Sequence, residues 1–548
     1  MTSRSRHRAA KGGAAPAPGG VKARPKRRWP RRTLIGANVL SLACLAAAAT
    51  AYAYVEHIIG NIHTAKGPNV IGPEYYSGGI PVPRSQLREK NGMKAENILL
   101  IGNETRIGLT PEQQRQYGSS LIYTGTLADI IMVLHLDPVN KTASLLSIPR
   151  DLFSPMPTGS PVGPFQKIDA ALNDGQGGPN NLVAAVEQDY GIPVNGFIEL
   201  NFNGFINSVD ALGGIKVYFP EPVWDAESLL WIPSSGCWHL NGTQALALVR
   251  ARHLQYDPPG DNEPRSDWPY DPESDLARIV RTHTFMKIVA GTAVREGKTD
   301  PAAALSFLNA ISKQIVVNQA LKGQLLSLVT YYRHVDIDNV AEKTLPVSGV
   351  PNSYYYGGYA IGSVLFPVQP ADNEVIRAWD PQVFPKAVPP VSVSVVSLTG
   401  SSYAAEEAGA ELSTHGLKVT SETAVYSPGT PSETLVLYPP HELAHALYVM
   451  KYLSGAVMMQ QSTAVAAGTV QVDVGSLVSI SVKATTTSTA PGEASKASTA
   501  PASTTTASAL PARAHPSTTT TTVPTPNGVV SSASDQEEPW DPRACPAH

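Results

Sequence analysis

Three runs of apolar residues in the first half of the chain have the length and composition of β-strands. They are NILLIG from Asn97, ADIIMVLHL over 128–136 and TASLLSI over 142–148. Short apolar runs bounded by turn residues are typical of strands buried on both faces. A dense pattern of further strands and helices continues to about Asp380, so residues 91–380 are expected to form one α/β domain.

The second and third runs flank the turn DPVNK and predict an antiparallel hairpin that folds about Val139. In that hairpin the numbers of paired residues add to 278 or 279, so Asp129 comes opposite the Pro149–Arg150 region. The first run ends in NETR, which places Glu104 and Arg106 at the end of its strand. Considered alone, the Asp129–Arg150 pair is explained by an ordinary structural salt bridge.

A second, smaller α/β unit is expected over residues 391–482, after the linker AVPP that ends at Pro390. VSVSVV over 391–396 alternates like a strand, and AAEEAGAELSTHG reads as a helix closed by Gly416. TLVLYPP over 434–440 is a second strand, followed by a helix and two more β-like runs. From Lys483 the chain is rich in Thr, Ser, Ala and Pro, which cannot bury enough apolar surface to fold, so 483–548 is predicted to be a disordered tail.

The N-terminal region has the pattern of a membrane anchor. Residues 1–32 contain eleven Lys and Arg and no acidic residue, which leaves the remainder with 31 basic and 45 acidic residues. The 23 residues of Thr33–Val55 carry no charge and span about 35 Å as a helix, enough to cross a bilayer. We therefore expect a single-pass membrane protein with a basic cytoplasmic tail (1–32), a transmembrane helix (33–55), a stalk (56–90) and an extracytoplasmic remainder. The basic tail shows no helical module for reading nucleic acid, so no nucleic-acid partner is expected.

The three cysteines predict no disulfide framework. Cys44 lies in the expected membrane span, and Cys237 and Cys545 lie far apart, the latter in the tail.

The stretch HELAHALYVMKYL, from His441, contains the H-E-x-x-H pattern of zinc proteases. On a helix its apolar residues share one face, and His441 and His445 fall on the opposite, water-facing side. The position six residues after the second His is Lys451, and no His or Glu follows until Glu493. We interpret the pattern as a chance occurrence.

Arginines recur in short, patterned segments of the predicted α/β domain over 91–380. ALALVRARH carries Arg250 and Arg252, which share a side if the chain there is extended, and SDLARIVRTH places Arg278 and Arg281 on one helical face after Ser274 as the N-cap. Together with Arg150 they indicate a polyanionic ligand, because guanidinium groups donate paired hydrogen bonds to phosphate. The carboxylates of Asp129 and Glu104 would repel phosphate unless a hard cation such as Mg²⁺ bridged them.

In these segments the sequence resembles the LytR-CpsA-Psr phosphotransferases of bacterial cell walls. The resemblance runs in order over about 95–290, through NILLIGNETR, ADIIMVLHLDP, LLSIPRDLF, KIDAALNDGQGG, FNGFINSVDALGGIKVYFPEPV, LNGTQALALVRARH and DLARIVRTHTFMK. Residues 391–482 resemble the C-terminal domain often attached to actinobacterial members. The family fold implies an α/β/α arrangement around a mixed central sheet.

The resemblance implies transfer of a glycopolymer phosphate from a polyprenyl-pyrophosphate carrier to peptidoglycan. It assigns pyrophosphate binding to Arg150, Arg250 and Arg252, with Arg278 and Arg281 completing the cationic wall and Arg106 beside them. Glu104 and Asp129 would hold Mg²⁺ or Mn²⁺, and Asp129 or Asp151 would activate the acceptor hydroxyl. Helices such as NGFINSVDALGG would wall a prenyl groove, although core packing explains them equally well.

Three positions depart from the family pattern. Glu104 stands where Asp is usual, Leu127 where an Arg is common, and Thr282-His283 where Gln-Gln is usual. Two alternatives therefore stay open: a wall-polymer or lipid-pyrophosphate binding protein without transfer activity, and a polyprenyl-pyrophosphate phosphatase.

Overall fold

The structure is a computed structural model, and its chain divides into two units, residues 1–57 and 58–548. It describes residues 49–50, 52–65, 76–77, 80–81, 89–106, 108–117, 126–172, 178–260, 264–272, 275–349, 354–356, 359–384, 390–426, 433–476, 478–480 and 538–546. The basic tail 1–32, most of the predicted span 33–55, parts of the stalk 56–90 and most of the tail 483–548 lie outside these residues. Among the helices within the described ranges, none is both long enough and apolar enough to cross a membrane.

A mixed seven-stranded sheet forms the centre of the larger unit. Its strands, in spatial order, are β1 (His63–Thr64), β17 (Ile315–Val317), β11 (Gly196–Asn201), β6 (Glu96–Asn103), β7 (Ala128–Asp137), β8 (Thr142–Ser147) and β18 (Ala341–Thr344). β6, β7 and β8 are antiparallel neighbours, whereas β11 runs parallel to β6 and β18 parallel to β8. The three strands predicted from the apolar runs are therefore confirmed.

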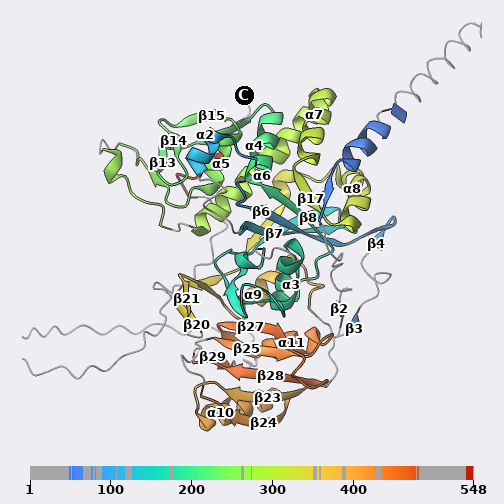
Figure 1. Cartoon of the computed structure of the whole chain (residues 1–548), viewed down its shortest axis with the longest axis vertical. Helices are drawn as coiled ribbons and strands as arrows, with labels where there is room; N and C mark the ends of the chain where they lie inside the picture. Colours follow the sequence, from blue (N-terminus) through green and yellow to red (C-terminus); the bar gives the residue numbers. More distant parts are fainter. Residues whose placement is uncertain are drawn as a thin grey trace, which may run out of the picture. The chain divides into compact units, whose positions relative to one another are not determined.

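Helices cover both faces of this sheet (Figure 1). Alternate residues of the central strand β6 point to opposite faces and therefore pack into two different apolar cores. Leu99 and Ile101 of β6 join a core with α3, whereas Ile98 and Leu100 pack on the α8 side. The first face carries η2 (Ile168–Leu172), α3 (Pro179–Tyr190) and α9 (Ala371–Trp379). The second carries α4 (Phe202–Ala211), α5 (Gly242–Arg250), α6 (Asp275–Thr299), α7 (Pro301–Ser312) and α8 (Gln319–Tyr332). The central sheet and its two helical layers agree with the predicted α/β class.

Shorter elements extend the α4–α6 side of the domain. Two three-stranded sheets contain β15 (Gly236–Leu240), β12 (Ile215–Phe219) and β30 (Arg543–Ala544), and β14 (Leu230–Ile232), β13 (Val223–Asp225) and β16 (Gln255–Tyr256). The other short elements are β2 (Tyr76–Ser77), β3 (Ile80–Pro81), β4 (Glu89–Lys90), β5 (Met93–Lys94), α2 (Pro111–Tyr117), β9 (Phe153–Pro155), β10 (Phe165–Lys167), η3 (Arg265–Asp267), η4 (Ile337–Asn339), β19 (Val347–Gly349), β20 (Tyr354–Tyr356), β21 (Tyr359–Gly362), β22 (Leu365–Pro367), β26 (Leu453–Gly455) and β29 (Val478–Ile480).

The segment after Pro390 forms a second sheet of five strands. Their spatial order is β24 (Lys418–Ala424), β23 (Ser392–Ser397), β28 (Thr469–Val474), β25 (Thr434–Tyr438) and β27 (Val457–Gln461), with helices α10 (Ser402–Thr414) and α11 (Leu443–Met450). This sheet shares one continuous apolar core with α3 of the first domain. Gly191, at the left-handed C-terminus of α3 (φ 66°), permits the approach, because a Cβ there would lie 2.8 Å from Leu447 Cδ1.

Two expectations about the C-terminal tail are wrong for its last described residues. Residues 538–546 are ordered, and Arg543–Ala544 pair with β12. Cys545 forms a disulfide with Cys237 across 308 positions of the chain. Composition predicts disorder for a polar segment that is considered alone. It gives no information about a distant part of the same chain that can pair with the segment, as β12 and Cys237 do here.

Candidate active site

The hairpin β7–β8 brings the first two site residues together. Its register pairs Met132 with Ser147, so the numbers of paired residues add to 279 as predicted. Beyond the last ladder pair, the Asp129 carboxylate (Oδ1) accepts a hydrogen bond from Arg150 Nη1 at 2.5 Å. The predicted convergence of Asp129 and Arg150 at this sheet edge is confirmed.

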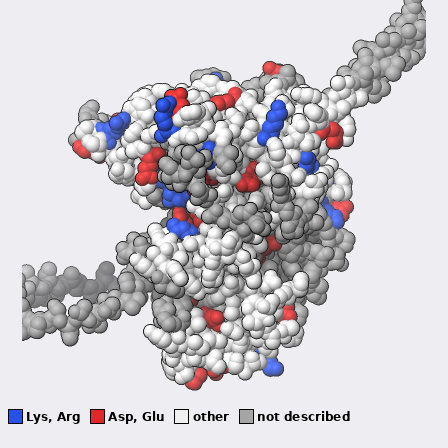
Figure 2. Space-filling view, viewed as in Figure 1, with Lys and Arg blue, Asp and Glu red and all other residues white. Residues whose placement is uncertain are grey.

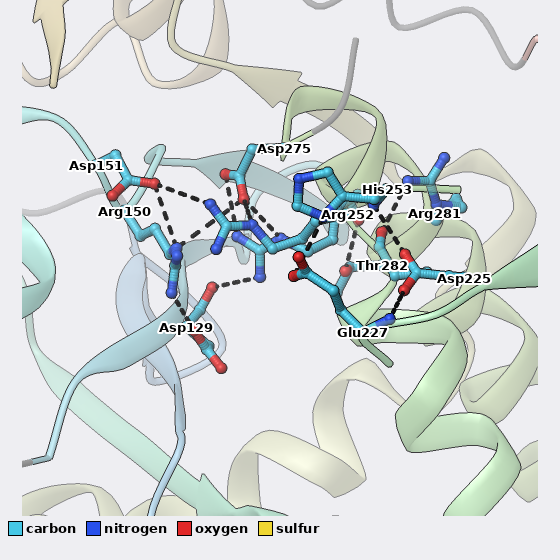
Figure 3. Close-up of polar contacts among 12 residues, drawn as sticks. Asp129, Arg150, Asp151, Asp225, Glu227, Arg252, His253, Asp275, Arg281 and Thr282 are labelled. Atoms are coloured by element: carbon cyan, nitrogen blue, oxygen red, sulfur yellow. Dashed lines mark hydrogen bonds and ion pairs between the residues drawn. The ribbon is translucent and has the colours of Figure 1, made fainter. Parts of the chain in front are cut away.

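Asp275 is the first residue of α6, and three arginines lie within 4.0 Å of its carboxylate. Arg252 Nε lies 2.8 Å from Asp275 Oδ1, Arg278 Nε 3.2 Å and Arg150 Nε 4.0 Å (Figure 3). Burial raises the pKa of Asp275, but the charges of Arg278, Arg252 and Arg150 outweigh it and lower the pKa overall. Sequence reasoning missed this residue, although an acid three positions before Arg278 in the first helical turn is a recognisable signal.

Asp151 is a second point where cations converge. Lys167 Nζ donates to Asp151 Oδ1 at 2.7 Å, while Arg150 Nε and Arg252 Nη2 lie 3.4 and 3.6 Å from Oδ2. Burial lowers the pKa of Arg150, but neighbouring carboxylates, of which Asp129 contributes most, raise it overall, so this guanidinium stays charged. Figure 2 likewise shows basic and acidic side chains interspersed around the hollow at the left of the molecule.

Glu104 and Arg106 follow β6 and lie beside the start of β7, where Glu104 N donates to Leu127 O at 3.2 Å. Arg106 is buried, with Nη2 3.7 Å from Glu104 Oε2. Burial, and then the charge of Asp129, raise the pKa of Glu104 against the opposing effect of nearby arginines. A divalent cation would relieve this repulsion between two carboxylates, so the pair fits a Mg²⁺ site.

That site would depend on ligands from outside the protein. Within the described part of the chain, no cluster of three or more His, Cys, Asp or Glu side chains is placed to hold a metal. Magnesium ions are commonly bound by one or two carboxylates together with phosphate oxygens and water. The donor set therefore suits a metal that arrives with a phosphorylated substrate.

Arg250 and Arg252 do not share an extended segment. Arg250 is the last residue of α5, and its guanidinium lies over the Phe202 ring at 4.8 Å. Arg252 follows the extended Ala251 and is directed to Asp275 and Asp151. The two side chains therefore contribute to different parts of the site, Arg250 beside the apolar wall and Arg252 among the carboxylates.

The prediction for Arg281 is wrong. Arg281 is fully buried, is paired with Asp271 and Asp541, and lies away from the arginine cluster (Figure 3). Residues three apart on a helix are offset by about 60° around its axis, which here separates Arg278 from Arg281. Arg281 nevertheless reaches the site indirectly, since its Nη2 donates to the carbonyl oxygen of Ala251 at 2.9 Å.

An apolar cavity of about 360 Å³ begins at the charged cluster. Its lining includes Asp129, Arg250 and Arg278, and otherwise consists mainly of apolar side chains from β6, β11, α4, α5, α6 and α7. Along α6 the lining extends from Arg278 to Ala293, a rise of about 22 Å. The site thus combines a charged end with a long apolar compartment, a shape suited to an amphiphile with an anionic head.

The positions that depart from the family pattern have structural roles here. Thr282 lines the cavity and donates to Arg278 O at 2.8 Å. His283 is buried, and its Nε2 lies 2.6 Å from Oγ of Ser147, the last residue of β8. Leu127 contributes its carbonyl oxygen to the Glu104 amide.

The H-E-x-x-H stretch does not present two histidines on one helix. α11 begins at Leu443, so His441 precedes it, in the left-handed region with φ 68°. His441 is exposed as predicted, whereas the prediction for His445 is wrong: it is buried, 3.0 Å from Glu442 Oε2. Glu442 also accepts from the Gly468 amide at 2.9 Å, so it closes a loop of the small domain.

Comparisons with known proteins identify a family and several relatives. The model of the LytR_cpsA_psr family matches residues 77–362. The probable cell wall biosynthesis protein LcpB of Corynebacterium glutamicum is 32% identical over 201 residues, 37% of this chain and 42% of that relative, so the match spans less than half of the relative's length. The polyisoprenyl-teichoic acid–peptidoglycan teichoic acid transferase TagU of Bacillus mycoides is 29% identical over 235 residues, 42% of this chain and 67% of the relative. Among solved structures, the LytR-Csp2A-Psr enzyme from Actinomyces oris covers 58% of this chain and 96% of its own, at 20% identity and a TM-score of 0.40.

Proposed function

The chain belongs to the LytR_cpsA_psr family, and we propose that it transfers a glycopolymer phosphate from a polyprenyl-pyrophosphate carrier to peptidoglycan in cell-wall assembly. The observation that carries the proposal is the apolar cavity whose lining also contains Arg250, Arg278 and Asp129. An apolar chain fits the compartment along α6, and a pyrophosphate fits the arginines at its charged end.

In the proposed reaction an acceptor hydroxyl oxygen attacks the phosphorus that carries the glycopolymer. The bond from that phosphorus to the bridging oxygen of the pyrophosphate breaks, and polyprenyl phosphate leaves. Arg150 and Arg252 neutralise the charge that develops on the phosphate oxygens and hold the group in line. The hydroxyl proton passes to a carboxylate, for which Asp129 and Asp151 are the two candidates at this site.

Glu104 and Asp129 are the residues we propose for Mg²⁺ or Mn²⁺. The bound cation would supply further neutralisation of phosphate charge. Two carboxylates that repel each other, close to the charges of Arg106, Arg150 and Arg250, support this assignment.

The proposed location is the cell membrane, with the N-terminus in the cytoplasm and residues after Val55 outside. The basic residues before an uncharged 23-residue segment support this topology. The Cys237–Cys545 disulfide adds support, since disulfides persist in oxidising compartments outside the cytoplasm. A reporter that is active only outside the cytoplasm, fused after His548, should work, and activity of a cytoplasmic reporter there would contradict the topology.

The test of function is incubation of the purified protein with a lipid-linked oligosaccharide, Mg²⁺ and a peptidoglycan acceptor, followed by mass analysis. Product in which oligosaccharide phosphate is joined to peptidoglycan supports the proposal. Release of sugar phosphate without coupling would identify a phosphatase, and intact bound lipid would identify a binding protein. Omission of the metal tests whether the reaction needs a divalent cation.

A further inference from the structure

We propose that the C-terminal residues Glu538–Cys545 form a strap that sets the position of the arginine segment 250–252, with Asp541 as a positioning residue that acts through Arg281. The strap structure stands on contacts alone, and its effect on substrate rests on the proposed use of Arg250 and Arg252 at the site.

Three attachments hold the strap against the α4–α6 side of the catalytic domain. Arg543 and Ala544 extend the sheet by pairing with Tyr218 and Val217 of β12. Cys545 is bonded to Cys237 of β15, the strand on the other side of β12. The strap is therefore joined covalently and through the sheet, although positions 481–537 separate it from β29 in the sequence.

The third attachment reaches the segment that follows the site arginines. The rings of Trp540 and Tyr256 are stacked, with 4.0 Å between the ring centroids and 5° between the ring planes. Tyr256 lies four residues after Arg252 and is part of β16, so the strap packs on the strand that directly follows the arginine segment.

Asp541 completes the connection from the strap to the site. It is buried at 2% exposure, and its Oδ1 lies 3.3 Å from Arg281 Nη1. Arg281 also binds Asp271, and its Nη2 donates to Ala251 O at 2.9 Å. Ala251 lies between Arg250 and Arg252. The Asp541 carboxylate therefore holds the Arg281 guanidinium in place, and Arg281 in turn holds the backbone carbonyl between the two site arginines.

The local turn keeps Asp541 in place for this contact. Its second oxygen, Oδ2, accepts from the Glu538 amide at 3.0 Å, and its own amide donates to Glu538 O at 2.9 Å. Both carboxylate oxygens are thus used, one for the shape of the strap and one for Arg281. Loss of the negative charge would leave Asp271 as the remaining carboxylate partner of Arg281 among the residues that the structure describes.

The test compares Asp541→Asn with the wild-type chain and with Asp473→Asn, which removes a partly buried carboxylate in the C-terminal domain. Hydrogen exchange is measured over residues 250–256, and binding of geranylgeranyl pyrophosphate with Mg²⁺ is measured by calorimetry well below the unfolding temperature. We expect Asp541→Asn to raise exchange in 250–256 roughly tenfold and to weaken probe binding by a similar factor, because small displacements of binding groups are costly. Asp473→Asn should change neither quantity.

The outcomes separate the strap from the proposed function. Unchanged exchange over 250–256 in Asp541→Asn, or an equal rise in Asp473→Asn, would overturn the positioning role whatever the ligand is. A merely structural strap would lower the unfolding temperature and leave probe binding unchanged. If exchange rises as expected but the wild-type chain neither binds the probe nor transfers, the strap stands and the proposed function falls. A chain that ends at Ser532 provides a second variant, for which the same two changes are expected.

Discussion

At the scale of single residues, the charged site is an interleaved set of arginines and carboxylates. Arg150 has Asp129, Asp151 and Asp275 within 4.0 Å, and Arg252 shares two of these carboxylates. The carboxylates offset the repulsion between closely spaced guanidinium groups and hold their planes in fixed directions. The arrangement orients several arginines in a small volume.

Arg150→Lys tests whether this orientation is needed for the reaction. Lysine keeps the charge but loses the planar group that donates from two nitrogens, so we expect transfer to slow by roughly ten- to a hundredfold with little change in unfolding temperature. The measurements are turnover and the unfolding temperature of the same preparation. A purely structural pair between Arg150 and Asp129 would give the opposite pattern, with lower stability and near-normal turnover at low temperature.

Asp129→Asn is the companion substitution. It removes a proposed metal ligand as well as a partner of Arg150, so turnover should fall and its dependence on Mg²⁺ concentration should shift to higher values. An Asp129→Asn protein with normal turnover and an unchanged metal dependence would remove this residue from the proposed metal site.

Glu187 makes the stability of the protein depend on pH. Burial raises its pKa to about 8, against the opposing hydrogen bond from the Val194 amide. The folded state therefore binds this proton more tightly than the unfolded chain, and its stabilising effect is lost as pH rises from about 4.5 to about 8. We expect the unfolding temperature to fall over this range, and to fall less in Glu187→Gln, which keeps an oxygen acceptor. Parallel curves for the two proteins would contradict the prediction.

The residues that sequence reasoning found and missed differ in how they are brought together. Asp129 and Arg150 belong to one hairpin, so a local turn and a register suffice to predict their contact. Asp275 meets Arg252 only after α5 and α6 pack, and Asp541 meets Arg281 across 260 positions. Such contacts depend on tertiary structure, and no pattern within either segment contains them.

At the scale of elements, α6 organises both parts of the site. Asp275 and Arg278 in its first turns belong to the charged cluster, and residues from Thr282 to Ala293 line the cavity. Strand pairing and helix existence were predictable here from apolar runs. The resemblance implied a prenyl groove walled by NGFINSVDALGG, and residues of that segment do line the cavity. The apolar pattern alone could not decide this, because a helix that lines a compartment and a helix that fills a core have the same pattern.

Ala293→Trp tests the cavity as a compartment for a prenyl chain. Ala293 lies about four helical turns from Arg278 at the charged end, so a large side chain there should block a long chain and spare the head-group site. We expect affinity for a long polyprenyl pyrophosphate to fall at least tenfold, while affinity for a short prenyl pyrophosphate stays unchanged. Val294→Trp, at an exposed neighbouring position, is the control and should alter neither affinity. Equal loss for both ligands in Ala293→Trp would indicate distortion of α6 instead.

At the scale of the whole molecule, the segment after Pro390 and the catalytic domain share one core. Leu447 of α11 packs at Gly191 of α3, and Tyr438 Oη donates to Gln188 O at 3.4 Å. Gln369 and Gly455 exchange backbone hydrogen bonds of 2.9 and 3.0 Å. The sequence predicted both helices of the small domain and its strands β23, β25 and β28, but neither β24 and β27 nor this contact. Apolar patterns show that a face is buried without showing what buries it.

Leu447→Ala should therefore weaken both domains together. Removal of a buried leucine side chain typically costs about 2–5 kcal/mol, and here the cavity would open at the boundary between α11 and α3. Because the core is continuous, we expect faster hydrogen exchange in peptides from α3 as well as from α11, and a single unfolding transition at a lower temperature. Tyr403→Ala, at an exposed position of α10, is the control and should leave exchange in α3 unchanged. Faster exchange confined to residues after Pro390, with α3 unaffected, would show that the two domains unfold independently despite their shared core.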